Sequence, residues 1–246
     1  MLLFTRPLPK LKTSARAFED AGIDAVGVAT SDIVYIPSES RAARDFISTT
    51  ALDAIVVTSV YAVEATVEGI KQKSSTDTHL TTLIAVGDAT AKKLHKAFSK
   101  TPNVTILTPC DHTSEGILAM QQLNEPNCQH VGIIKGEGGR DAIAQGLVQR
   151  GIEVSSFCVY KREQLTRPVY TKRWKISDVS GIIATSEAMA NQLITHYGNT
   201  LLTLPWLTVS ERIANSLKNI GVERVFVCSR ATDQALTAWV KDNWEY

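Results

Sequence analysis

The sequence lacks the features that mark membrane and secreted proteins. No apolar run approaches the length of about 20 residues that a helix needs to span a bilayer. The apolar stretch at the amino terminus is interrupted at Arg6 and Pro7, which leaves it too short for the core of a secretion signal. The chain has only 4 cysteines, all widely spaced, which favours buried thiols in a reducing compartment over a disulfide framework. We therefore expect a cytoplasmic protein.

The chain also lacks an excess of positive charge and a metal-binding motif. It carries 26 Lys and Arg against 25 Asp and Glu, which gives a net charge of +1. A chain with almost equal numbers of positive and negative charges is not suited to bind the phosphate backbone of a nucleic acid. We therefore do not expect nucleic acid as a partner. The only neighbouring Cys/His pairs are Cys110 with His112 and Cys128 with His130, and their spacing fits no common zinc site. We expect no bound metal.

The chain does contain a regular alternation of short apolar runs and longer segments with helical periodicity. The runs are mostly continuous rather than alternating, which is typical of strands buried on both faces of a parallel sheet. They cover residues 2–5, 25–28, 54–58, 82–86, 104–108, 131–134, 155–160, 181–185, 206–209 and 224–228. Helix candidates lie between them, such as 12–21, which is followed by Gly22. This alternation predicts a doubly wound α/β fold.

Four segments recur along the chain in the same order. Val57-Thr58-Ser59 resembles Ala184-Thr185-Ser186, for example, and the strand–helix unit that ends at Gly22 resembles the one that ends at Gly151. The recurrence predicts two related α/β halves, although α/β units in general resemble one another. Two polar segments, 31–50 and 161–178, contain the connections between the halves. They leave open whether one domain is inserted into the other or the two follow in sequence.

Small hydroxyl residues gather where predicted strands end and helices begin. These positions are Thr5-Arg6, Thr58-Ser59, Gly87 to Thr90, Thr113-Ser114, Thr185-Ser186 and Ser210. Ligands of open α/β sheets bind outside the carboxyl ends of the strands, where helix amino termini favour anions. Each hydroxyl is also accounted for as an ordinary helix cap. The set predicts an anion site, while any single member does not.

A glycine-rich turn follows the apolar run 131–134. In Lys135-Gly-Glu-Gly-Gly-Arg140, Gly136-x-Gly138 matches half of a dinucleotide fingerprint, but the third small residue is missing because position 141 is Asp. The turn is also explained as flexible backbone that, with Lys135 and Arg140, approaches a carboxylate or phosphate. Tyr160, followed by two cations, is a candidate weak acid or an ordinary tyrosine at a strand end.

Taken in order, these residues resemble the uroporphyrinogen-III synthase family over nearly the whole chain. The segments that carry the resemblance are Thr5-Arg6-Pro7, Asp53 to Val63, Ala85 to Ala91, Lys135 to Arg140, Val159 to Arg162, Ala184 to Ser186 and Val209 to Ala214. The resemblance implies two flavodoxin-like domains, each a doubly wound parallel sheet, joined by a two-stranded linker. One domain would hold both termini, residues 1–35 and 172–246, and the other would be the insertion 36–171. The active-site cleft would lie between them.

The resemblance also implies the reaction. Linear hydroxymethylbilane would lose water and close to the macrocycle with its last pyrrole ring inverted, without cofactor or metal. Tyr160 matches the family's tyrosine and becomes the candidate acid for the departing hydroxyl. The residues implied to bind substrate are Thr5, Arg6, Thr58, Ser59, Gly87, Thr90, Lys135, Gly136, Thr185, Ser186 and Ser210. A monomer is expected, with transient contact to the deaminase that makes the substrate.

Two residues depart from the family pattern. Tyr61 stands where a smaller or polar residue is common, and Glu187 puts a carboxylate where an acidic substrate comes close. Two other functions stay open on the residues alone. One is a non-catalytic module that binds an anionic polycarboxylate, because no strong catalytic triad is present. The other is a dinucleotide-dependent enzyme built on the glycine-rich turn.

Overall fold

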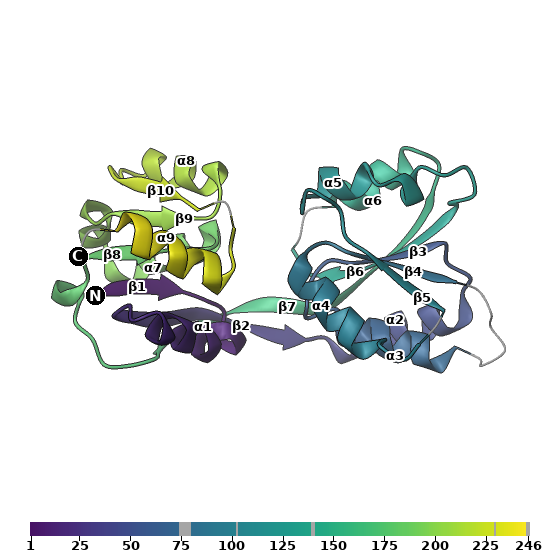
Figure 1. Ribbon diagram of the computed structural model, residues 1–246, viewed down its shortest axis with the longest axis horizontal. Coiled ribbons are helices and arrows are strands. Elements are labelled where there is room, and N and C mark those ends of the chain that lie inside the picture. The colour runs from purple at the N-terminus through teal and green to yellow at the C-terminus, as the bar shows by residue number, and fades with distance from the viewer. Residues whose placement is uncertain (74–79, 102, 139–140, 229, 245–246) are drawn as a thin grey trace. The chain divides into compact units, whose positions relative to one another are not determined.

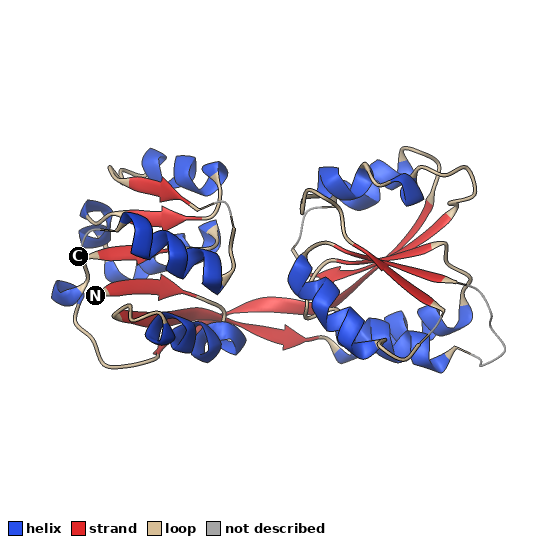
Figure 2. Ribbon diagram, viewed as in Figure 1, coloured by secondary structure: helices blue, strands red, loops and turns tan. Residues whose placement is uncertain are grey.

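The computed structural model describes residues 1–73, 80–101, 103–138, 141–228 and 230–244. The chain forms two compact units, one of residues 1–33 and 163–246 and the other of residues 34–162 (Figures 1 and 2). The expected boundaries, after residues 35 and 171, lie two and nine residues further along the chain. Both boundaries fall inside unbroken strands, residues 25–35 and 153–170, so no loop marks either of them.

The first unit is built on a parallel sheet. Its strands are β1 (Leu2–Thr5), β2 (Ala25–Tyr35), β8 (Gly181–Ile183), β9 (Trp206–Thr208) and β10 (Val225–Val227), in the spatial order β10-β9-β8-β1-β2. The pairs within this order are all parallel, with Leu3 beside Val26 on one side and Ile182 on the other. All four residues of β1 are buried, as expected for a central strand covered on both faces.

Helices cover both faces of this sheet. They are α1 (Leu8–Asp20), α7 (Glu187–Tyr197), α8 (Glu211–Asn219) and α9 (Asp233–Asn243), with 3₁₀ turns at Ile176–Asp178 and Asn199–Thr203. Phe18 of α1 and Val240 of α9 pack with Phe4 in one cluster, whereas Leu193 of α7 and Leu217 of α8 pack on the other face. Helix α1 begins four residues before the predicted start because Pro9 fits the first turn of a helix.

The second unit also has a parallel sheet. Its strands are β3 (Ala54–Val57), β4 (Thr81–Ala85), β5 (Val104–Leu107), β6 (His130–Gly136) and β7 (Glu153–Tyr170), in the order β7-β6-β3-β4-β5. Its helices are α2 (Pro37–Thr49), α3 (Val63–Gln72), α4 (Asp88–Ala97), α5 (Ser114–Leu118) and α6 (Ala142–Val148), with a 3₁₀ turn at Gln121–Leu123. Figure 1 shows α2 and α3 on one side of this sheet and α5 and α6 on the other.

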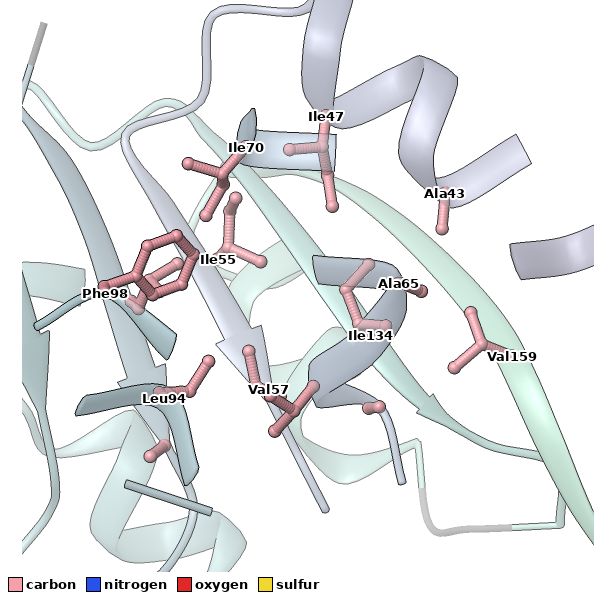
Figure 3. Close-up of a cluster of buried hydrophobic side chains, with 14 of the residues drawn as sticks. Ala43, Ile47, Ile55, Val57, Ala65, Ile70, Leu94, Phe98, Ile134 and Val159 are labelled. Atoms are coloured by element: carbon pink, nitrogen blue, oxygen red, sulfur yellow. The ribbon is translucent and has the colours of Figure 1, made fainter. Parts of the chain in front are cut away.

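The two faces of strand β3 belong to two separate cores. Ile55 and Val57 pack against α2, α3 and α4 (Figure 3), while Ala54 and Val56 pack toward α5 and α6. Successive side chains of a strand point to opposite faces. A strand covered by helices on both faces is therefore apolar at every position, which explains the continuous apolar runs in the sequence.

The two units share one strand plan. The order β2-β1-β8-β9-β10 in the first corresponds to β7-β6-β3-β4-β5 in the second. The recurring segments lie at corresponding strands: Thr58-Ser59 and Thr185-Ser186 come after β3 and β8, and Gly22 and Gly151 precede β2 and β7. The predicted internal repeat and α/β fold are therefore confirmed, and all ten predicted strands are present in the described residues.

Strands β2 and β7 are much longer than the predicted runs 25–28 and 155–160. They pair with each other in opposite directions, as Thr171 N donates to Gly27 O at 3.0 Å and Ile36 N donates to Val159 O at 3.0 Å. The extension of β7 is largely polar, whereas that of β2 mixes buried residues such as Ala29, Ser31 and Ile33 with partly exposed ones. Apolar periodicity therefore could not reveal them. Within the described residues, no helix combines the length and the apolar character required to cross a membrane.

Candidate active site

The second unit contains a cavity of about 640 Å³ at the carboxyl ends of its strands. Thr58, Lys135, Gly136 and Tyr160, which the family resemblance put in the site, line it, as do Thr113 and Ser114 of the predicted set of strand-end hydroxyls. The remaining lining residues are Val86, His112, Glu115, Glu137, Gly138, Ile143 and Arg162. The cavity is therefore where the predicted candidate acid and part of the predicted anion-binding set come together.

Strand topology explains why these residues meet. Thr58 follows β3, Val86 follows β4 and Gly136 ends β6, and parallel neighbours finish at the same edge of a sheet. Thr58 is fixed there by its backbone, since its N–H donates to Ile134 O at 3.1 Å. Its hydroxyl donates to the same carbonyl at 3.3 Å. Thr58 is thus held at the edge of the sheet where the carboxyl ends of the strands lie.

Tyr160 lies directly against Gly136. A β-carbon at position 136 would come within 2.5 Å of two atoms of the Tyr160 ring and 2.8 Å of its hydroxyl oxygen. The register between β6 and β7 shifts at this point, where Gly136 pairs with Tyr160. The Tyr61 ring completes the packing, with its centroid 5.4 Å from that of Tyr160. Tyr61, the first departure from the family pattern, therefore supports the candidate acid.

We expect Gly136→Ala to displace the Tyr160 ring, because the new methyl group has no room. The free energy of unfolding should fall by about 1–3 kcal/mol, as overpacking predicts, and any activity that depends on Tyr160 should fall with it. Gly132→Ala is the matched control in the same strand, since its nearest contact is a flexible Leu52 atom at 3.3 Å. Urea unfolding of both variants measures the difference. Equal stability of the two would contradict the packing argument.

Charged side chains in and beside the cavity are partly paired. Lys135 Nζ donates to Asp141 Oδ1, and the lysine side chain is only 13% exposed. His112 Nε2 lies 3.5 Å from Asp88 Oδ1. His112, Glu115, Glu137 and Arg162 were absent from the predicted set. His112 and Glu115 come from the segment after β5, which pairs with β4, and this strand order could not be predicted from the sequence. Glu137 follows β6 and Arg162 lies in β7, close in the chain to the predicted Gly136 and Tyr160.

Three predicted residues of this unit do not line the cavity. Thr90 is buried in α4, and Ser59 accepts a bond from Tyr61 N at 3.4 Å. Gly87 lies just outside, because a β-carbon there would be 3.7 Å from His112 Nδ1. Arg140, which sequence reasoning put beside Lys135, is outside the described residues, as is Gly139.

The predicted residues of the first unit follow its strands in the same way. Ser186 and Ser210 are the N-caps of α7 and α8, where their hydroxyls accept from Met189 N at 3.2 Å and Ile213 N at 3.4 Å. The interpretation of these serines as helix caps is therefore confirmed. Thr5 is buried, and its hydroxyl lies 3.5 Å from Ile183 O.

Arg6 is committed to the fold of the first unit. Its guanidinium donates to Ser14 Oγ at 3.1 Å, to Ala231 O at 3.0 Å and to Asp233 Oδ1 at 2.5 Å. The side chain is 7% exposed. The prediction of a cation available to substrate does not describe this arginine, because its charge is already compensated inside the unit.

The negative charge of Glu187, the second departure from the family pattern, is also paired within the fold. Its carboxylate accepts from Ser216 Oγ at 2.8 Å and from the Arg212 guanidinium. The Ser216 hydroxyl bond, together with Arg212, holds the pKa of Glu187 below its ordinary value. This carboxylate therefore joins α7 to α8 and does not stand unpaired beside Ser186.

The four thiols differ in their surroundings. Cys128 and Cys228 are buried, Cys158 is half-buried and Cys110 is exposed. The expectation of buried thiols is thus wrong for Cys110, which lies in the polar loop after β5. In the described part of the chain, no group of three or more His, Cys, Asp and Glu side chains is arranged to hold a metal ion.

The comparisons with known proteins agree on one family. The family model "Uroporphyrinogen-III synthase HemD" matches residues 12–238. The chain is 30% identical over 160 residues to uroporphyrinogen-III synthase of Escherichia coli K12, an alignment that covers 62% of this chain and 63% of that protein. The chain thus matches a little under two thirds of that relative's length.

Solved structures agree at the level of the fold. A mutant uroporphyrinogen III synthase of the extreme thermophile Thermus thermophilus is similar with a TM-score of 0.59 and 14% identity, covering 98% of both chains. Uroporphyrinogen-III synthetase of Helicobacter pylori 26695 gives a TM-score of 0.58 at 14% identity and the same coverage. Because the family match extends over nearly all of the two-unit α/β fold, this chain belongs to the uroporphyrinogen-III synthase family.

Proposed function

We propose that this protein is a uroporphyrinogen-III synthase, which closes hydroxymethylbilane with loss of water and inversion of the last pyrrole ring. The observation that carries the proposal is the family match over residues 12–238. The cavity of the second unit supports it, because that cavity presents the Tyr160 side chain beside strand-end donors. The product would be uroporphyrinogen III, an intermediate of heme biosynthesis.

The chemistry requires little from the protein beyond one proton and a fixed substrate geometry. An electron-rich pyrrole expels the terminal hydroxyl as its C–O bond breaks, and Tyr160 donates the proton that converts the leaving oxygen to water. The resulting azafulvene cation is attacked by the substituted carbon of the last ring, which gives a spiro intermediate. That intermediate fragments and closes again at the free carbon, which then loses its proton. Holding the flexible chain for this attack is the main catalytic task.

The eight carboxylates of the substrate need donors, and both units provide them at strand ends. In the second unit we assign this role to Thr58, Ser59, Gly87, Lys135 and Gly136, and in the first to Thr185, Ser186 and Ser210. Helix amino termini and hydroxyls suit carboxylates. Thr5, Arg6 and Thr90 are left out because all three are buried, and the side chains of Thr5 and Arg6 are also hydrogen-bonded within the fold.

The finer architecture belongs to the same proposal. Each unit is a flavodoxin-like domain, an interpretation supported by its strand order, which follows the flavodoxin pattern 2-1-3-4-5 when β1 and β6 are counted as first strands. The paired strands β2 and β7 serve as the two-stranded linker. We further propose a cytoplasmic monomer that contacts the preceding deaminase transiently. Size-exclusion chromatography with light scattering, with and without that deaminase, tests the last two points.

An isomer assay tests the activity. Hydroxymethylbilane is generated with a deaminase, this protein is added, and the oxidised porphyrin isomers are separated by chromatography. We expect type III in excess, whereas the protein-free and heat-denatured controls give type I by spontaneous closure. Type I alone from folded protein would overturn the proposal and favour the non-catalytic module that binds a polycarboxylate.

A pair of Ser186 variants separates capping from substrate binding. Ser186→Asn and Ser186→Asp both keep an N-cap acceptor for Met189 N–H, so both should retain the stability of α7. Only the aspartate adds negative charge where we expect a substrate carboxylate, and it should raise KM several-fold. Ser186→Ala, which loses the cap, should lower stability by about 1 kcal/mol. Equal KM values for the Asn and Asp variants would remove Ser186 from the binding set.

A further inference from the structure

The first unit contains a second cavity, of about 870 Å³, that the proposed reaction does not use. It lies between the end of β7, the turn that follows, and the last turn of α7. Tyr170, Trp174 and Tyr197 form its aromatic wall, and Lys172, Arg173 and Lys175 bring three cations to it. Its volume falls within the range of about 300–1,000 Å³ that is usual for small-molecule sites.

The cavity belongs to the amino-terminal edge of the parallel sheet. Lys172 Nζ donates to Asp24, the residue just before β2, and Thr171 N donates to Gly27 O near the start of that strand. Ser186 and Ser210, by contrast, follow the carboxyl ends of β8 and β9. The two sets of residues therefore lie at opposite edges of one sheet, and the cavity is separate from the proposed carboxylate-binding positions.

The aromatic wall is fixed in place. The Trp174 ring centroid lies 5.8 Å from that of Tyr170 and 5.2 Å from that of Tyr197. The two tyrosine hydroxyl oxygens are 2.6 Å apart and share a hydrogen bond. Burial, followed by this bond, raises the pKa of Tyr197, so its hydroxyl stays neutral. Trp174 and Tyr197 also pack against the buried core of the unit. The wall is thus a packed aromatic surface with two hydroxyl groups at its edge.

The electrostatics of the cavity favour an anion. Lys172 is paired with Asp24, whereas the exposed side chains of Arg173 and Lys175 have no ion-pair partner in the described part of the chain. One carboxylate, Asp178, also lines the cavity. The carboxyl end of α7 adds about half a negative charge. The two unpaired positive charges of Arg173 and Lys175 are larger in sum than these negative charges, so the cavity is positive overall.

We propose that this cavity is a second ligand site, which takes a planar aromatic ring system carrying acidic groups. The ring lies against Trp174 and the two tyrosines, where aromatic faces supply most of the buried contact. The acidic groups meet Arg173 and Lys175 in charge-assisted hydrogen bonds. A nucleotide and a porphyrin carboxylate share this chemistry. The site does not depend on the synthase activity, and it binds ligand whether or not the protein is a catalyst.

Binding to the full chain tests the site with two probes, ATP and uroporphyrin I, measured by isothermal titration calorimetry. We expect saturable binding of at least one probe. The variant Arg173→Gln/Lys175→Gln should weaken that binding by about tenfold or more, because both charged contacts are lost. The matched control is Lys218→Gln/Lys241→Gln, which removes the same charge from exposed positions of α8 and α9 and should bind as the parent protein does.

The two probes, ATP and uroporphyrin I, distinguish which class of ligand the cavity takes. Binding of ATP alone that responds to the cavity variant indicates a nucleotide, and binding of the porphyrin alone that responds in this way indicates a tetrapyrrole. Porphyrin bound at the proposed active site is recognised because it survives the cavity variant. The proposal is overturned if neither probe binds, or if the cavity variant and the control variant bind both probes equally. All four substituted side chains are exposed, and circular dichroism verifies that both double variants stay folded.

Discussion

Tyr160→Phe should lower kcat about 100-fold while type III product remains detectable. General acid catalysis by a positioned side chain contributes about 10²–10⁴-fold, and we expect the lower end because the pyrrole itself drives loss of the hydroxyl. The ring stays packed against Gly136 and Tyr61, since phenylalanine has the same shape. The substrate should therefore bind as before, with KM nearly unchanged. The measurement is the initial rate of type III formation over a range of substrate concentrations.

A second tyrosine provides the control for this experiment. Tyr35 is 45% exposed, is the last residue of strand β2 and does not line the cavity. Tyr35→Phe should therefore leave kcat and KM at the parent values. If Tyr160→Phe behaves in the same way as Tyr35→Phe, Tyr160 is not the acid, and proton donation has to come from another group at the cavity or from water.

Asp233→Ala should destabilise the first unit by about 3–5 kcal/mol, the usual result of leaving a buried charge without its partner. Arg6 is 7% exposed and Asp233 27%, so the guanidinium would lose its charged partner at a place that little water reaches. The substitution also removes the acceptor of the Ser14 hydroxyl, which donates to Asp233 at 2.8 Å. Urea unfolding followed by circular dichroism measures the loss.

Two further variants identify the cause of this destabilisation. Asp242→Ala removes an exposed carboxylate from the same helix and should change stability little. Arg6→Met together with Asp233→Ala removes both charges and should recover part of the loss, since an apolar pair of similar size tolerates burial better than one unpaired ion. Equal stability of the Asp233 and Asp242 variants would show that Arg6 remains solvated and would restore it as a candidate for substrate binding.

Much of the fold followed from local patterns in the chain. Continuous apolar runs such as 54–58 predicted strands buried on both faces, and each of the ten appears where it was expected. The recurrence of Thr58-Ser59 as Thr185-Ser186 predicted two related units. These features are readable because burial on both faces of a strand acts on every consecutive residue. The extensions of β2 and β7 could not be predicted in this way, because their side chains show neither a continuous apolar run nor a regular alternation.

The candidate site was only partly predictable. The order of motifs led to Tyr160, Lys135 and Gly136, which do line one cavity, and to Arg6, which does not serve as an open cation. His112 and Arg162 line the same cavity beside predicted residues, Thr113 and Tyr160, but were not themselves assigned a role. Strand ends are local signals, whereas the loops that meet at them depend on the order of strands in the sheet.

By itself, then, the sequence determined which segments become strands, that the chain is built from two similar units, and which family it belongs to. Only the tertiary structure decided which charges are compensated. Arg6 pairs with Asp233, 227 positions away, and Tyr160 packs on Gly136 through a register shift between two strands. The tertiary structure also brings Tyr170, Trp174 and Tyr197 together in the aromatic wall. The physical reason is range: periodicity and capping act between near neighbours in the chain, whereas ion pairing, packing and cavities depend on contacts that exist only after the strands are ordered.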